Sequence, residues 1–203
     1  MERKLIISDL FRKAWQSLTA QIWVLAGLVI GYTIISLLLT CTVPYVGFPF
    51  RTALGVANTL LSLVFTLGYV KNLFQTLYGE EPQFSAYGQM SRKVFSLFFA
   101  YILYWIIVGI GLALLIVPGV YFALRFMFVP QIIVEENVGA IASLRRSWEI
   151  TRGATGQIFK LALACCGIML LGNMALGIGV FVAIPLVLLM IGAAYRRLII
   201  NGQ

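Results

Sequence analysis

Few side chains in this sequence could do chemistry, and they are spread along the chain. It has seven acidic residues, three cysteines and no histidine, so it lacks the commonest acid–base catalyst and metal ligand. The acidic pairs Glu80–Glu81 and Glu135–Glu136 are expected on loops, where neighbouring carboxylates are usually just solvated. Cys165 and Cys166 would point to different faces of a helix, which suits neither a disulfide nor a shared metal. The sequence therefore predicts no enzyme, metal site or cofactor, and it predicts cysteines that act as small buried hydrophobes.

Arg125 stands out because it is the single charged residue in the apolar run VPGVYFALRFMFVPQIIV at 117–134. An arginine inside a membrane usually faces the bundle and finds a partner. No carboxylate is predicted within the membrane, so the partner must be a hydroxyl, a backbone carbonyl or a ligand. Two interpretations stay open. The guanidinium has a structural role, snorkelling to the outer headgroups or pairing inside the bundle, or it binds an anionic group such as a lipid phosphate.

The composition indicates which elements must position these residues. The chain is 61% hydrophobic and 11% charged, against roughly 45–50% and 25% in soluble domains. A spanning helix needs about 20 apolar residues, and proline and glycine divide longer runs. Pro118 with Gly119 is expected to break one run, and Pro130 is expected to disturb the next. The sequence predicts an all-α membrane bundle with about six spans, at 21–41, 53–74, 93–116, 120–135, 157–174 and 178–197.

The last two spans are short and flank a glycine-rich turn, so a re-entrant hairpin is an alternative to two full crossings.

A short pattern recurs before two of the spans. LFRKAW (10–15) corresponds to SLRRSW (143–148), and each is followed by Gln-Ile-aromatic, with a weaker copy at 84–98. The sequence predicts a single membrane domain over 1–203, organised as three repeated units at 1–78, 79–136 and 137–203. Each unit is an amphipathic helix in the cytoplasmic interface followed by a two-pass hairpin. Ser8 or Asp9 is expected to cap the first of these helices, Asn137 to begin the one at 137–153, and Gly153 to end it.

Basic residues set the expected orientation, because positive charge stays on the cytoplasmic side. Of the basic residues that flank the predicted spans, only Arg51 falls on one side. The others fall on the opposite side, namely Arg3, Lys4, Arg12, Lys13, Lys71, Arg92, Lys93, Arg145, Arg146, Arg152, Lys160, Arg196 and Arg197. Both termini are therefore predicted to be cytoplasmic. The net charge of +8 indicates attraction to anionic lipid headgroups. It does not indicate nucleic acid binding, because the charges lie beside spans and not on a separate domain.

One order of residues resembles a known family. The order is PG…R…P…E…A…RSW…G, and it is formed by Pro118-Gly119, Arg125, Pro130, Glu135 or Glu136, Ala140 or Ala142, Arg146-Ser147-Trp148 and Gly153. This order is similar to that of the membrane domain associated with bacterial glycerophosphoryl diester phosphodiesterases and of the related YciC-type small envelope proteins. The resemblance covers mainly residues 117–160. It implies a helical inner-membrane module and not the phosphodiesterase activity, whose histidines this chain lacks.

Two functions follow as hypotheses. The first is a non-catalytic protein of the bacterial cytoplasmic membrane that contacts phospholipid, or organises a membrane-protein partner or a second copy of itself. Its expected contact residues are Arg125, Arg145, Arg146 and Trp148, and its expected structural residues are Pro118, Gly119, Pro130 and Gly153. The second is a small transporter or flippase-like carrier for a lipid or small amphiphile, which predicts a polar cavity reaching the middle of the membrane.

Overall fold

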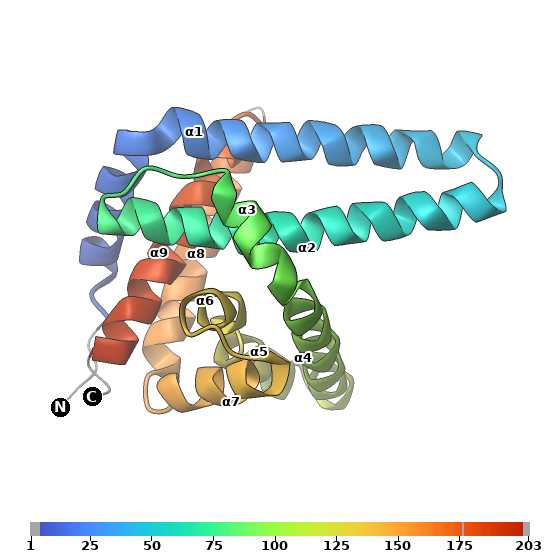
Figure 1. Cartoon of the computed structure of the whole chain (residues 1–203). Helices are drawn as coiled ribbons and strands as arrows, with labels where there is room; N and C mark the ends of the chain where they lie inside the picture. Colours follow the sequence, from blue (N-terminus) through green and yellow to red (C-terminus); the bar gives the residue numbers. More distant parts are fainter. Residues whose placement is uncertain (1–4, 176, 201–203) are drawn as a thin grey trace.

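The computed structural model describes residues 5–175 and 177–200, and within them the chain is helical with no strand (Figure 1). Arg3 and Lys4 of the predicted basic set lie outside the described residues. The helices are α1 (Ile7–Thr42), α2 (Phe48–Tyr78), α3 (Ser85–Met90), α4 (Val94–Leu114), α5 (Ile116–Arg125), α6 (Val129–Glu135), α7 (Ala140–Ile150), α8 (Thr155–Met174) and α9 (Val180–Ile200), with 3-10 turns η1 (Val43–Tyr45) and η2 (Ser91–Lys93).

The protein is a multi-pass membrane protein built as an all-α bundle. Six stretches of the described chain are long and apolar enough to cross a membrane, namely Ile7–Tyr45, Phe48–Tyr78, Ser85–Leu114, Ile116–Glu135, Thr155–Met174 and Val180–Ile200. The last two hold 20 and 21 residues, which is the length of a full crossing, so their geometry favours two spans over a short re-entrant pair. Many apolar side chains face outward, such as Leu37 and Leu38 at 59% and 62% exposure, as a lipid-facing surface requires.

The N-terminal amphipathic segment and the first span form one helix with a sharp bend. Gln21 leaves the helical region at φ −132° and ψ 26°, at the residue where the sequence places the start of the span. Before the bend, Leu10, Ala14 and Leu18 are buried, and this part packs against α9 while the rest of α1 pairs with α2 (Figure 1). The expected cap is wrong, because α1 starts after Ile6 without a side-chain cap.

The turn between α4 and α5 lies earlier than the sequence predicts. Leu115 is extended and separates the two helices, whereas Pro118 and Gly119 lie inside the first turn of α5. A proline is tolerated there because that N–H has no partner within a helix. Gly119 has a packing role instead, since a Cβ built on Gly111 would lie 2.9 Å from the Cα of Gly119. The α4–α5 hairpin is therefore held close by two facing glycines.

The fourth span is broken near its middle, which the sequence predicts only as a disturbance at Pro130. Helix α5 ends at Arg125, and α6 begins at Val129 with Pro130 in its first turn. The carbonyl of Phe126 loses its usual donor to the proline, and it accepts the N–H of Val129 at 3.2 Å instead. The break turns the chain so that Arg125 faces α7.

Helix α7 also starts later than expected, because Ala140 and not Asn137 begins it. Asn137 adopts a left-handed conformation at φ 55° and belongs to the preceding turn. Gly153, at φ 82°, follows the end of α7 as predicted, in a conformation that glycine adopts without strain.

The prediction that the cysteines are small buried hydrophobes holds for Cys165, which is buried, whereas Cys41 and Cys166 are exposed.

The three predicted units each contain an amphipathic segment followed by a helical hairpin: α1 with α2, α3 with α4 to α6, and α7 with α8 and α9. The first segment is continuous with its span, whereas α7 is separate from α8. The repeat itself stays a prediction.

Candidate functional site

Arg125 lies at the joint between the broken fourth span and α7, and its side chain is inside the protein with 6% exposure. Its Nε donates to the hydroxyl of Tyr121 at 3.0 Å. Its Nη1 donates to the carbonyl of Trp148 at 3.0 Å and to Oγ1 of Thr151 at 3.1 Å. In return, Oγ of Ser147 donates to the carbonyl of Arg125 at 2.7 Å. The joint is therefore linked by hydrogen bonds in both directions.

The electrostatics of the joint explain how a buried cation is accommodated without a carboxylate. Arg125 is the last residue of α5, and Thr151 is the C-cap of α7, so the guanidinium lies near the C-terminal ends of two helices. Each such end carries a partial charge of about −0.5. Trp148 provides one of the last carbonyls of α7, which also accepts from Oγ1 of Thr151 at 3.2 Å. Two helix ends thus supply the negative potential that a carboxylate would otherwise give.

Aromatic rings complete the surroundings of the guanidinium. Its central carbon lies 4.1 Å from the centre of the Trp148 ring and 5.2 Å from that of Tyr121. Phe126 packs against the same indole with ring centres 5.8 Å apart. Such cation–π contacts contribute about 2 kcal/mol or more when they are shielded from water.

Of the alternatives predicted for Arg125, the structure shows pairing inside the bundle. The guanidinium is buried among these partners and does not reach the surface, so a role of Arg125 in lipid binding stays a prediction. Arg125 fixes the position of α7. Its partners are of the kinds that the sequence implies, hydroxyls and a carbonyl, but sequence reasoning did not identify Tyr121, Ser147 or Thr151.

A second polar cluster ties α6, α7 and α9 together at one edge of the bundle. Glu136 follows α6, and its Oε1 accepts from Nε of Arg146 at 3.1 Å and from the hydroxyl of Tyr195 at 3.1 Å. Arg146 also approaches Glu149 at 3.9 Å. Glu136 is thus a structural partner and not the solvated loop carboxylate that the sequence suggests.

Arg145 and Trp148 border a groove between α4 and α7. The groove has a volume of about 490 Å³ and is lined otherwise by Leu103, Ile107, Phe126, Ile141 and Leu144. The Arg145 side chain is 83% exposed, and its Nε lies 3.2 Å from Oε1 of Glu149, which is itself 50% exposed. The four predicted contact residues thus fall into two groups. Arg125 and Arg146 bond to other parts of the bundle, whereas Arg145 and Trp148 lie beside an apolar groove.

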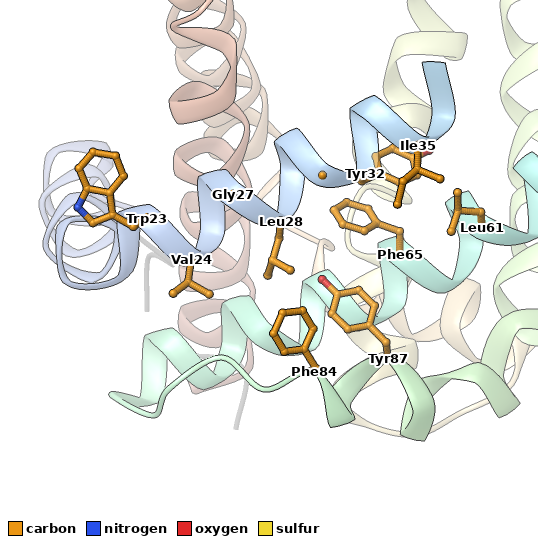
Figure 2. Close-up of a pocket in the computed structure, with 11 residues that line it drawn as sticks. Trp23, Val24, Gly27, Leu28, Tyr32, Ile35, Leu61, Phe65, Phe84 and Tyr87 are labelled. Carbon is orange, nitrogen blue, oxygen red and sulfur yellow. The ribbon is translucent and has the colours of Figure 1, made fainter. Parts of the chain in front are cut away.

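A larger apolar groove, of about 600 Å³, lies between α1, the middle of α2 and the start of α3. Figure 2 shows Val24 and Leu28 of α1 facing the rings of Phe84 and Tyr87 across the gap. Gly27 in the same groove has open space where a Cβ would stand. The groove offers a largely apolar surface, and none of its lining residues is charged.

Within residues 5–175 and 177–200, no group of three or more cysteine, aspartate or glutamate side chains is placed to hold a metal ion.

Comparison with known proteins places most of this architecture in one family. A family model described as "Domain of unknown function (DUF7847)" matches residues 53–198, from the start of the second span to the end of the last. No curated protein and no solved structure matched the chain. The matched region contains the Arg125 joint, the Glu136 cluster and the α4–α7 groove. The chain therefore belongs to the DUF7847 family.

Proposed function

We propose that the protein is a non-catalytic module of the bacterial cytoplasmic membrane that holds an anionic phospholipid between α4 and α7. The observation that carries the proposal is the apolar groove of about 490 Å³ with the exposed Arg145 beside it. An acyl chain suits the groove, and a phosphate suits the guanidinium. Trp148 adds an amphipathic ring of the type enriched at headgroup depth.

Arg145 is the basic residue of α7 whose charge is available to a lipid. Its pair with Glu149 is exposed, and such pairs contribute about 0–1 kcal/mol, so a phosphate can replace the carboxylate. Arg146 is occupied by Glu136. The Arg125 joint supports the proposal indirectly, because it holds the buried face of α7 on the bundle and leaves Arg145 and Ile141 outward.

The proposed orientation has the termini and α7 on the cytoplasmic side. Contacts join the segments that the sequence assigns to that side: Asp9 lies 3.5 Å from Arg197, Tyr78 donates to Glu135 at 3.2 Å, and Nζ of Lys93 donates to the carbonyl of Asn137 at 2.9 Å. Positive charge is retained inside. Reporter fusions test this: a fusion after Arg197 should give cytoplasmic activity, and an insertion in the turn at 43–47 should give periplasmic activity.

Resemblance to the membrane domain of the bacterial phosphodiesterases supports the same proposal. The residues that carry it lie in the two polar clusters that attach α7 to the bundle: Arg125, Ser147 and Trp148 at the joint, and Glu136 with Arg146 at the edge. They build a membrane scaffold and present no catalytic group.

Lipid retention measures the proposed function. The protein is reconstituted in nanodiscs that contain phosphatidylglycerol and phosphatidylcholine, and bound lipid is counted by native mass spectrometry. Arg145→Ala should lower retained phosphatidylglycerol by up to about fivefold, because it removes one exposed ion pair with the phosphate, and such a pair contributes about 0–1 kcal/mol. Ile141→Trp, which fills the groove from its exposed edge, should lower retention of both lipids.

Arg92→Ala is the matched control, since Arg92 is an exposed basic residue on the same proposed side but away from the groove. It should leave lipid retention unchanged. Equal losses in both arginine variants would mean that attraction is general and that the groove holds no particular lipid.

A carrier for a lipid or small amphiphile is the second candidate function, and one observation favours it. The fourth span is broken at 126–128 beside a cavity at the centre of the bundle, and broken helices line substrate sites in transporters. Uptake of a fluorescent lipid analogue across reconstituted vesicles tests it, and a rate equal to that of protein-free vesicles would exclude it.

A further inference from the structure

A cavity lies where α1, α2, α4, α6 and α9 meet, and it has a volume of about 340 Å³. A neighbouring cavity of about 470 Å³ shares Tyr101, Met127 and Pro130 with it. Ligand pockets commonly occupy roughly 300–1,000 Å³. The two cavities together provide room for a small amphiphile beside the break in the fourth span.

Gln131 gives this cavity a polar group that requires a partner. The residue has 4% exposure and lines the cavity from the first turn of α6. Its Oε1 is buried and has no hydrogen-bond partner among the described residues. A buried amide without its bond costs about 1–3 kcal/mol, so the site is complete only when something donates a hydrogen bond to Oε1.

Three of the five hydroxyl side chains that line the cavity are already committed as donors, and the other two, Tyr32 and Tyr101, make no hydrogen bond to Gln131. Tyr69 donates to the carbonyl of Leu25 at 3.2 Å, Thr33 donates to Val29 at 2.7 Å, and Thr66 donates to Ser62 at 2.8 Å. A hydroxyl carries one hydrogen, so these three cannot also serve Gln131. No described residue supplies the donor that Oε1 of Gln131 lacks, so a molecule in the cavity can supply it.

The lining also limits the charge of that molecule. Every residue that lines the two cavities is uncharged, and an ionised group buried without a partner is very costly. The neighbouring cavity is bordered by Trp105, which is 67% exposed on α4. An uncharged, largely apolar molecule can therefore reach the cavity sideways from the lipid.

We infer that the central cavity binds one uncharged amphiphile whose hydroxyl donates to Oε1 of Gln131 while its hydrocarbon part extends past Tyr101 and Trp105. The inference does not rest on the α4–α7 groove, which takes an anionic headgroup. It rests on Gln131, and it supplies a substrate class for the carrier candidate.

Two probes, of which only one has a hydroxyl donor, test the inference. Binding of radiolabelled sn-1,2-dioctanoylglycerol to the purified full-length protein is compared with binding of its acetate ester, which lacks the hydroxyl hydrogen. The wild-type protein should bind the alcohol about five- to tenfold more tightly, as expected for one buried hydrogen bond. Gln131→Leu should remove that preference.

Gln75→Leu is the matched control. Gln75 also has a buried Oε1 without a partner but does not line either cavity, so its variant should keep the preference. Arg145→Ala should keep it too, which separates this site from the anionic-lipid groove. Gln131→Leu without ligand should unfold no more easily than wild type, because it removes an unpaired acceptor.

Equal affinity of the wild-type protein for the two probes would overturn the inference, since the amide would then hold only water or nothing. A preference that survives in Gln131→Leu would overturn it as well, because another residue would be responsible for it.

Discussion

Replacing Arg125 by methionine should destabilise the protein and release α7 from the bundle. Methionine keeps much of the length and apolar stem of arginine but has no donor. The variant loses the bonds to Tyr121, Trp148 and Thr151 and the contact with the indole ring. We expect a local effect, with α7 loosened while the packing of α1 against α9 persists.

The magnitude follows from the contacts. A hydrogen bond from a charged donor contributes about 1.5–3 kcal/mol, and a shielded cation–π contact about 2 kcal/mol. The bonds share one side chain and are not additive, and the variant also avoids burying a charge. We therefore expect a net loss of about 3–5 kcal/mol. Arg125→Lys should lose less, about 1–3 kcal/mol, because one ammonium keeps the charge near both helix ends but not the planar fork.

Two measurements decide the outcome. Unfolding in detergent gives the free energy, and hydrogen exchange by mass spectrometry shows where protection is lost. Arg145→Met is the matched control, because it makes the same change on the exposed face of α7, and it should shift stability by less than about 0.5 kcal/mol. If Arg125→Met unfolds within about 1 kcal/mol of wild type and α7 amides stay protected, Arg125 does not hold α7.

Two further predictions use matched pairs. Ser147→Ala should lower the free energy of unfolding by about 1–2 kcal/mol because it removes the donor to the carbonyl of Arg125. Ser143→Ala loses only a bond within its own turn, so it should lower that free energy less, and chemical unfolding of the two variants shows the difference. Gly111→Ala should destabilise the protein by about 1–3 kcal/mol because its Cβ would meet the facing backbone of α5. Gly109→Ala has open space for its Cβ and should be neutral or stabilising. Thermal melts that rank the two variants in the opposite order would refute the close approach of α4 and α5.

Hydropathy predicted the number and approximate position of the spans because a bilayer requires about 20 apolar residues wherever the chain crosses it. The sequence placed the start of the first span at about residue 21, where the helix bends at Gln21, but it did not predict the bend itself. The Pro118-Gly119 pair was misleading because proline and glycine favour both a turn and the first turn of a helix. Only packing decides between them, and here the facing Gly111 does so.

The partners of Arg125 could not be predicted, although their kinds could. Trp148 and Thr151 follow it by 23 and 26 positions, and nothing local specifies that α7 returns to the break in the fourth span. Two sequence signals point to the joint in retrospect. Tyr121 lies one turn before Arg125, and Ser147 and Thr151 lie one turn apart on the buried face of α7.

The break at 126–128 and the arginine beside it are best understood together. A continuous fourth span would carry Arg125 through hydrocarbon with no carboxylate in reach, which is costly. Ending α5 at Arg125 places the cation at one helix C-terminus, and α7 brings a second, so two partial negative charges replace one ionised side chain. The same break opens the carbonyl of Arg125 to Ser147 and places Pro130 and Gln131 at the central cavity. Pro130→Ala should restore a continuous helix, and it should weaken both the attachment of α7 to the bundle and the binding of dioctanoylglycerol. Loss of only one of the two would show that the break does not link them.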